Sequence, residues 1–452
     1  MPSRQEQLQS YQFMVQRVVS ALVLRETDPP QSPFRRAVGA AFVSVLVTVI
    51  IAAGFGVYSI FTGGGNQQWR KPGAVIIEKD TSAVFVFREG KLHPALNFTS
   101  AMLASEAAKP PVFRVAAKSL QDVPWGQTIG IRDVPNTLAG KKNLAGYPWS
   151  VCTTPTKDGP VSTVLVGETT GTLVGDGEAF LVKSSTRGAE TYLLWKGRLF
   201  PISANNASLL GKGAQPTVVS PAFVNGLPEG RALQPVNPGP NAGKPSQFNP
   251  QLWVIGEIIV VQDVAAEDRY VIVLEDRIAW ISQVQAQLSG RAPRREAYGD
   301  VTNNGKRQIV NDMLPQDSGA QTPPADMPSI VTYNGPGLCS VIKDDKATAE
   351  LRKDVTINLD QRPKTARRSG DNAIYADYVL VPNGKGAVVL SGQTYIYVSR
   401  DGVRYAMASA AVKDKLGFDG VTPLNLPSQL VALLPEGPGL DPTEAMVPVT
   451  IS

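Results

Sequence analysis

The longest hydrophobic segment of the chain lies close to its N-terminus. Residues 37–61 have the sequence AVGAAFVSVLVTVIIAAGFGVYSIF, which is 25 residues without a charge. As an α-helix, this segment is long enough to cross a hydrocarbon core of about 30 Å. A cleaved signal peptide is the alternative, but its apolar region usually has only about 7–15 residues. The pattern therefore predicts a cytosolic tail at 1–36, an uncleaved transmembrane helix at 37–61 and a linker at 62–80.

The charges that flank this segment set its expected orientation. Five arginines and three acidic residues precede it, and Arg35 and Arg36 lie directly beside it. Because positively charged flanks stay in the cytosol, we expect the N-terminus to lie inside the cell. The chain is therefore predicted to be a single-pass protein of the inner membrane, with the region after the helix on the periplasmic, extracytoplasmic side.

Apolar residues of the tail recur at spacings of three and four, which is the period of one face of an α-helix. Such a stripe needs a partner, and the sequence leaves two kinds open. The helix lies on the lipid surface, or it packs on another protein. The residues of this predicted docking stripe are Leu8, Tyr11, Val15, Val18 and Leu22.

Beyond the predicted membrane helix, a unit of hairpin, helix and proline-initiated turn occurs four times. Alternating apolar residues on both sides of a Gly- or Asp-containing turn are the signature of a β-hairpin. A Ser, Thr or Asn precedes each helical stretch and can cap its first free N–H groups. The four hairpin turns are Glu89–Gly90, Lys196–Gly197, Glu275–Asp276 and Asp401–Gly402, and the units close at Pro124, Pro228, Pro315 and Pro435.

A second level of order lies between these units. A cysteine and a Gly-turn strand separate the first unit from the second, and the same pair separates the third from the fourth. We therefore expect an α+β, mainly β fold, with four small hairpin-helix repeats around a central β-rich domain of approximate two-fold symmetry. The expected boundaries are repeat 1 at 81–135, a first central-domain segment at 145–185, repeat 2 at 188–233, a linker at 234–250, repeat 3 at 251–320, a second central-domain segment at 330–390 and repeat 4 at 392–440.

Cys152 and Cys339 are the only cysteines in the chain. Both follow the predicted membrane helix and occupy matching positions in the two halves, which favours a disulfide between them. The alternative is two buried free thiols. A metal site would need more ligands than the sequence offers nearby.

Composition and charge indicate an ordered protein and give no sign of binding to nucleic acid. Apolar residues make up 43% of the 452 residues and charged residues 18%, which is typical of an ordered protein with more than one packed unit. The net charge of +5 is spread along the chain without a dense basic run, so binding to nucleic acid is not indicated.

Catalytic chemistry finds little support in the sequence. His93 is the only histidine, and the matching positions of the other units hold Phe200, Ala279 and Tyr405, a pattern that favours packing. No segment has the Gly-x-x-x-x-Gly-Lys-Ser/Thr spacing with which backbone N–H groups wrap phosphates. No catalytic, cofactor-binding or metal-binding residues are therefore predicted.

Several motifs together resemble a known family. They are Ser10-Tyr11-Gln12-Phe13 in the tail, GKLHPALNFTSAML from Gly90, GQTIGI from Gly126, the paired cysteines and DGVRYAM near the C-terminus. With these motifs the chain resembles EccB, the membrane core component of type VII (ESX) secretion systems, over nearly its whole length.

The resemblance implies a structural scaffold in a large inner-membrane complex that exports proteins. The implied partners are an EccC-type motor ATPase, EccD-type and EccE-type membrane subunits, and further copies of the chain itself. It also implies an exported domain of four repeats around a central domain, closed by one disulfide. Some family members carry an ATPase label, so an extracytoplasmic nucleotide hydrolase is one alternative function. A cell-wall-binding module is the other.

Overall fold

The structure is a computed structural model that describes residues 3–24, 34–63, 67–186, 188–249, 251–262, 267–314, 322–360, 362–365 and 373–449. Pro315, where the third predicted unit closes, lies outside these residues. Contacts divide the chain into two units, which are described separately. The first is Met1–Lys71, Ile76–Ser82 and Phe113–Val123, and the second is Pro72–Val75, Ala83–Val112 and Pro124–Ser452.

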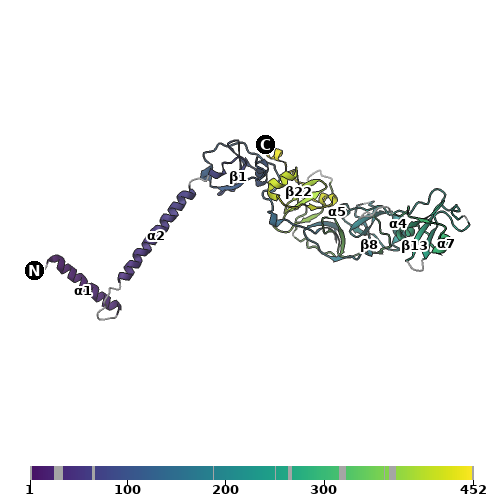
Figure 1. Ribbon diagram of the computed structural model, residues 1–452, viewed down its shortest axis with the longest axis horizontal. Coiled ribbons are helices and arrows are strands. Elements are labelled where there is room, and N and C mark those ends of the chain that lie inside the picture. The colour runs from purple at the N-terminus through teal and green to yellow at the C-terminus, as the bar shows by residue number, and fades with distance from the viewer. Residues whose placement is uncertain are drawn as a thin grey trace. The chain divides into compact units, whose positions relative to one another are not determined.

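The first unit contains the two long helices, drawn in purple in Figure 1. Helix α1 (Arg4–Leu24) begins with a reciprocal cap, in which the Ser3 N–H donates to Glu6 Oε2 at 2.8 Å and the Glu6 N–H to Ser3 Oγ at 3.4 Å. This pairing satisfies N–H groups that a first helical turn leaves free. Helix α2 (Phe34–Gly63) contains the apolar segment, and two 3-10 turns follow at η1 (Gln67–Trp69) and η2 (Ala117–Leu120).

Four small sheets share one strand order. They run β3-β2-β1-β4, β10-β9-β8-β11, β14-β13-β12-β15 and β23-β22-β21-β24, with β16 beyond β14 and β17 also beside β8. In the last three sheets, the final strand runs parallel to the first. Their strands are β1 (Ala74–Glu78), β2 (Val84–Arg88), β3 (Lys91–Ala95), β4 (Val112–Val115), β8 (Glu178–Ser184), β9 (Thr191–Trp195), β10 (Arg198–Ile202), β11 (Thr217–Val219), β12 (Ile258–Gln262), β13 (Arg269–Val273), β14 (Ile278–Ile281), β15 (Arg294–Ala297), β16 (Ile309–Val310), β17 (Ser329–Val331), β21 (Ala387–Ser391), β22 (Thr394–Val398), β23 (Arg404–Met407) and β24 (Leu424–Asn425).

A short capped helix follows the hairpin of each small sheet. Its N-cap side chain accepts a hydrogen bond from the backbone N–H three residues on, as expected for Asn and Ser at this position. These helices are α3 (Phe98–Ala104) after Asn97, α4 (Ala204–Leu210) after Ser203, α6 (Gln283–Leu288) after Ser282 and α8 (Ala410–Lys413) after Ser409.

Further short helices, which the sequence pattern did not predict, complete the secondary structure. After the last strand of the second, third and fourth sheets come α5 (Pro221–Gly226), α7 (Tyr298–Thr302) and α9 (Ser428–Ala432). The others are η3 (Lys141–Asn143), the π-helical turn η4 (Asp414–Phe418) and α10 (Pro442–Ala445).

A closing segment then lies beside the second hairpin strand. Leu92 is bridged to Trp125, Leu199 to Glu229 and Arg404 to Glu436, all in parallel. In the third sheet the corresponding strand is β16, where Ile278 pairs with Ile309. β16 lies earlier in the chain than the predicted closing turn at Leu314–Pro315, of which only Leu314 is among the described residues.

One position of the second hairpin strand faces one position of the closing segment, and the sizes of the two residues are matched. In the third sheet the closing segment β16 has no glycine at this position, so the proline and glycine of the other units did not identify it. A Cβ atom added to Gly126, Gly230 or Gly437 would overlap the ring of His93, Phe200 or Tyr405, respectively. In the third sheet, Ala279 faces Val310 instead. In the first, second and fourth sheets the larger residue is on the hairpin strand and the glycine is on the closing segment. In the third sheet the larger residue, Val310, is on the closing segment. His93 thus occupies a packing position, as the sequence predicted; its partner is Gly126, and its Nδ1 lies 3.2 Å from the Gln127 carbonyl oxygen.

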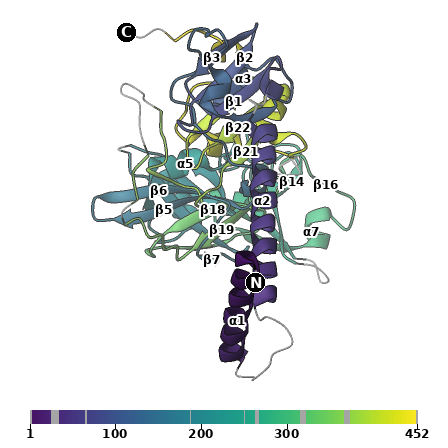
Figure 2. The same cartoon turned by 90° about the vertical axis from the view of Figure 1, so that its left-hand side faces the viewer.

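The central sheet has the order β20-β6-β5-β18-β19-β7. β5 and β18, from distant regions of the sequence, are antiparallel neighbours at its middle (Figure 2). β20 pairs with β6 and β7 pairs with β19, so each of the two regions lends one strand to the other. The strands are β5 (Trp149–Thr156), β6 (Gly159–Val166), β7 (Thr172–Leu173), β18 (Leu338–Ile342), β19 (Ala349–Lys353) and β20 (Tyr378–Leu380).

Three strands, β1, β8 and β21, belong to a small sheet although the sequence pattern placed their residues in a linker or in the central domain. β8 falls in the segment expected for the central domain, yet it pairs with β9 of the second small sheet. β21 likewise pairs with β22 of the fourth sheet, and β1 lies within the expected linker at 62–80. A hairpin alone leaves a strand edge unpaired, and a third strand from the preceding segment satisfies it.

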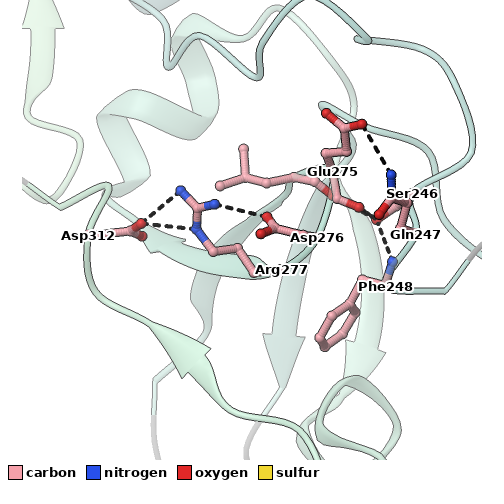
Figure 3. A network of polar contacts seen from close by, with 8 residues as sticks. Ser246, Gln247, Phe248, Glu275, Asp276, Arg277 and Asp312 are labelled. Atoms are coloured by element: carbon pink, nitrogen blue, oxygen red, sulfur yellow. Dashed lines mark hydrogen bonds and ion pairs between the residues drawn. The ribbon is translucent and has the colours of Figure 1, made fainter.

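The described part of the segment expected to be a linker at 234–250, which is residues 234–249, is folded back on the third small sheet. Ser246 Oγ donates to the Leu274 carbonyl at 2.6 Å, and the Gln247 N–H donates to the Glu275 carbonyl at 2.7 Å. Figure 3 shows Ser246, Gln247 and Glu275 at the turn that joins β13 to β14. The proline-rich connection is therefore ordered by hydrogen bonds to the turn that it crosses.

Candidate functional site: disulfide centre, tail and inter-sheet clamp

The two cysteines face each other at the middle of the central sheet. Cys152 of β5 and Cys339 of β18 are directly opposite in the antiparallel register, and a disulfide joins them with a Cα–Cα distance of 4.0 Å. Both are completely buried, in a cluster with Leu165, Val341 and Val355. The bond covalently joins the two segments of the sequence that build the sheet, 187 residues apart.

The predicted docking stripe lies on α1, and all five of its side chains are exposed. The exposed fraction ranges from 43% for Val15 to 74% for Leu22. Sequence reasoning missed that the apolar surface is wider, because Phe13, Met14, Val19 and Val23 are exposed as well. At about 100° per residue, Phe13 lies far from the stripe, so α1 carries apolar groups on more than one face.

Helix α2 contains the candidate membrane span. Val38–Tyr58 is long and apolar enough to cross a bilayer, with a mean hydropathy of 2.5. Its described large apolar side chains, among them Phe42, Leu46 and Ile50, are exposed. An exposed apolar surface of this length fits contact with lipid tails.

A polar clamp joins the first and fourth small sheets. Asp419 receives Lys109 Nζ on Oδ2 at 2.8 Å and Lys141 Nζ on Oδ1 at 2.6 Å. The hydrogen bonds from Lys109 and then Lys141 hold the pKa of the Asp419 carboxyl well below its usual range. Nearby, Lys415 Nζ donates to the carbonyls of Leu103 and Ser105, at the C-terminal end of α3.

This clamp gives the protein a pH-dependent element of stability. Because the folded pKa of Asp419 is depressed, its contribution is present above the unfolded carboxyl pKa of about 4 and is lost as the pH falls below it. Thermal unfolding of the Asp419→Asn variant is expected to have a lower midpoint than the unsubstituted protein at pH 6. The difference should be modest, since exposed ion pairs are screened, and should shrink progressively as the pH falls from about 4 to about 2. A difference that stays constant down to that pH would contradict this origin.

No group of three or more His, Cys, Asp or Glu side chains that could hold a metal ion occurs among the described residues. The disulfide and the clamp join segments within the large domain, whereas the tail and α2 present exposed apolar side chains. These features point to assembly as the chemistry that the arrangement supports.

Comparison with known proteins decides the family. The model of the family described as "Type VII secretion system ESX-1, transport TM domain B" matches residues 1–451. The chain belongs to this EccB family. The match covers the tail, the apolar helix and the disulfide-tied domain together, and it confirms the resemblance found in the sequence motifs.

Curated relatives of the EccB family are similar over nearly the whole chain. The protein named ESX-3 secretion system ATPase EccB3, from Mycolicibacterium smegmatis, is 26% identical over 98% of this chain and 90% of its own length. The ESX-1 secretion system ATPase EccB1 of the same species is 27% identical over 98% and 94%. The ESX-3 secretion system ATPase EccB3 of Mycobacterium tuberculosis is 31% identical over 62% and 55%.

Solved EccB-type structures share the fold. A chain of an intact ESX-5 inner membrane complex superposes with a TM-score of 0.64 at 23% identity, covering 100% of this chain and 96% of that one. A chain of the EccB3 dimer from the ESX-3 core complex also gives 0.64 at 23% identity, covering 83% and 100%. The expected mixed fold, mostly sheets with an N-terminal apolar helix, is therefore confirmed.

Proposed function

We propose that this EccB chain is a structural scaffold subunit of a type VII secretion inner-membrane complex, which supports protein export across the cell membrane. The observation that carries the proposal is the family match over residues 1–451, which includes every segment that a bitopic scaffold needs. Related chains of this fold come from an ESX-5 inner membrane complex and from an EccB3 dimer. The proposed partners are EccC-type, EccD-type and EccE-type subunits and further copies of the chain.

The proposed topology has the tail at 1–36 in the cytosol, the helix at 37–61 in the inner membrane and the large domain on the periplasmic side. The arginine-rich flank and the exposed apolar surface of α2 support it. In this arrangement the disulfide lies in a compartment where it can persist.

We further propose that the four small sheets are copies of one repeat, two in each half, around an approximate two-fold axis. Their common strand order, their capped helices and the matched ring and glycine positions support equivalence. The central sheet supports the axis, because β5 with β18 and β6 with β19 occupy matching places on either side of its middle. The segments keep the boundaries expected from the sequence, apart from β1, β8 and β21, which join repeats 1, 2 and 4.

Extraction in mild detergent tests the scaffold. The tagged chain is run on a native gel under oxidising conditions, and comigrating proteins are identified by mass spectrometry. Migration at megadalton size with a P-loop ATPase and multi-span membrane proteins is the expected result. A lone monomer in every detergent would contradict the scaffold and favour an independent wall-binding module.

The docking stripe of α1 provides a sharper prediction for this assay. Val15→Asp places a charge on the stripe and is expected to reduce recovery of the complex at least about tenfold, because burying an unpaired carboxylate is costly. The chain should stay in the membrane fraction, since α2 is unchanged. Ser10→Asp, about 140° away around the helix, is the matched control and should assemble normally. Equal losses from both variants would argue against a specific docking stripe.

A second function is suggested by the names of the curated relatives, which call those proteins ATPases. This chain has no Gly-x-x-x-x-Gly-Lys-Ser/Thr segment with which to wrap the phosphates. Hydrolysis would therefore need a site of another kind. Turnover of ATP by the purified full chain, free of copurifying EccC-type protein, would establish it, and its absence would sink the hydrolase candidate.

A further inference from the structure

A groove lies between repeats 2 and 3. Its cavity of about 320 Å³ is lined from three sides, by residues after the repeat 2 closing segment, by α6 and by the segment after β16. A neighbouring cavity of about 730 Å³ shares Ala232, Leu233 and Gln234 with it. We call this the 2–3 groove. The residues that define it are Ala232, Gln234, Val284, Leu288, Asp312 and Met313.

Repeats 1 and 4 contain the matching place, if the repeat equivalence proposed above holds. The Leu233 N–H donates to the Pro201 carbonyl at 2.7 Å, and the Leu440 N–H donates to the Ala406 carbonyl at 2.7 Å, so these two leucines correspond. Val310 faces Ala279 as Gly126 faces His93. Counting on from these positions, Asp312 corresponds to Thr128.

In the 1–4 pair this place is filled by the end of the chain itself. From Leu440 the chain continues directly into α10, which packs on α3. The strand-like residues after it pair with repeat 1, since the Val449 N–H donates to the Thr128 carbonyl at 2.8 Å and Pro448 is bridged to Ile129. A helical turn followed by an extended apolar segment therefore fits this kind of groove.

In the 2–3 pair the chain turns away at the same point. After Leu233 it crosses to the turn between β13 and β14, where Asn241 Nδ2 donates to Glu275 Oε1 at 3.1 Å. The wall of the groove is nevertheless held in place. Arg277 donates to Asp312 from Nε at 3.0 Å and lies 2.9 Å from it through Nη2, as Figure 3 shows.

We propose that the 2–3 groove is a docking site for a short peptide segment of a partner protein. The segment has one helical turn, which packs on α6, followed by apolar extended residues that pair along Asp312 and Met313. Its chemistry is that of Asp441–Val449, the segment that fills the matching place in the 1–4 pair.

The test uses the full chain in detergent and a fluorescein-labelled synthetic peptide with the sequence LDPTEAMVPV, which is residues 440–449. Fluorescence anisotropy is expected to show saturable binding. Ala232→Trp fills the groove from an exposed position and should weaken the affinity at least tenfold. Ala242→Trp, at another exposed alanine, is the matched control and should bind normally.

Hydrogen–deuterium exchange locates the bound peptide. The expected result is slower exchange at 310–314 and no change at 124–130. Absence of saturable binding would overturn the proposal. Binding that Ala232→Trp leaves unchanged would also overturn it, because the peptide would then be replacing the chain's own C-terminal segment. Either failure leaves the scaffold proposal standing if the native-gel assembly is intact.

Discussion

Replacing Gly230 with valine is expected to destabilise the large domain by about 3 kcal/mol, because the new side chain would overlap the ring of Phe200. Phe200 is only 1% exposed and packs in a cluster with Leu193, Leu210 and Leu233, so the ring has no free space to enter. Urea denaturation of the purified chain measures the loss as a lower midpoint.

The third small sheet suggests how to reverse this loss. There the ring position holds Ala279 and the glycine position holds Val310. Phe200→Ala alone should cost about 4 kcal/mol through the cavity that it leaves. The double variant Phe200→Ala/Gly230→Val should lose about 2–3 kcal/mol less than the sum of the single variants, since the valine fills the cavity.

A glycine without a neighbour provides the control. A Cβ atom at Gly175 would meet nothing within 4 Å, so Gly175→Val should change stability by less than about 0.5 kcal/mol. Additive losses in the double variant would show that the pair in repeat 3 is not a size exchange. They would also weaken the proposed equivalence of the repeats.

Removing the disulfide is expected to cost about 5 kcal/mol, the largest single loss that the fold predicts. The bond closes a loop of 187 residues, and loop-closure entropy gives a stabilisation of this size for a loop of roughly that length. Cys152→Ala/Cys339→Ala should therefore unfold at a much lower urea concentration than the unsubstituted chain under oxidising conditions.

A reductant distinguishes the bond from the packing of its side chains. It should lower the urea midpoint of the unsubstituted chain and leave that of the double alanine variant unchanged. Titration of the denatured, unreduced chain should find no free thiol. Two titratable thiols together with an unchanged midpoint would mean that the cysteines are not bonded.

The features that the sequence predicted well are local ones. The hairpin at Glu89–Gly90 and the cap at Asn97 depend on residues a few positions apart, and both lie where the pattern placed them. The apolar helix is equally local. Cys152 and Cys339 are far apart in the chain, but the matching places that the sequence pattern predicted for them indicated the bond.

The features that it missed depend on pairing between distant segments. The sequence pattern did not assign β8 to the second small sheet, because its pairing with β9 and with the parallel strand β11 is not part of the hairpin signature. β7 and β20 each pair with a strand from the other half of the sequence. Such pairings follow from the whole fold and leave no short periodic signal. The groove between repeats 2 and 3 was missed for the same reason.

The packing of α10 on α3 has a consequence for the order in which the domain forms. In the proposed topology, a chain that crosses the membrane with its N-terminus anchored presents α3 before residues 441–449. Until residues 441–449 have folded, α10 does not cover its part of the α3 surface. Pro448 and Val449 are also not yet paired with Ile129 and Thr128. A chain that stalls before residues 441–449 emerge would therefore leave the surface of α3 that α10 covers exposed to solvent.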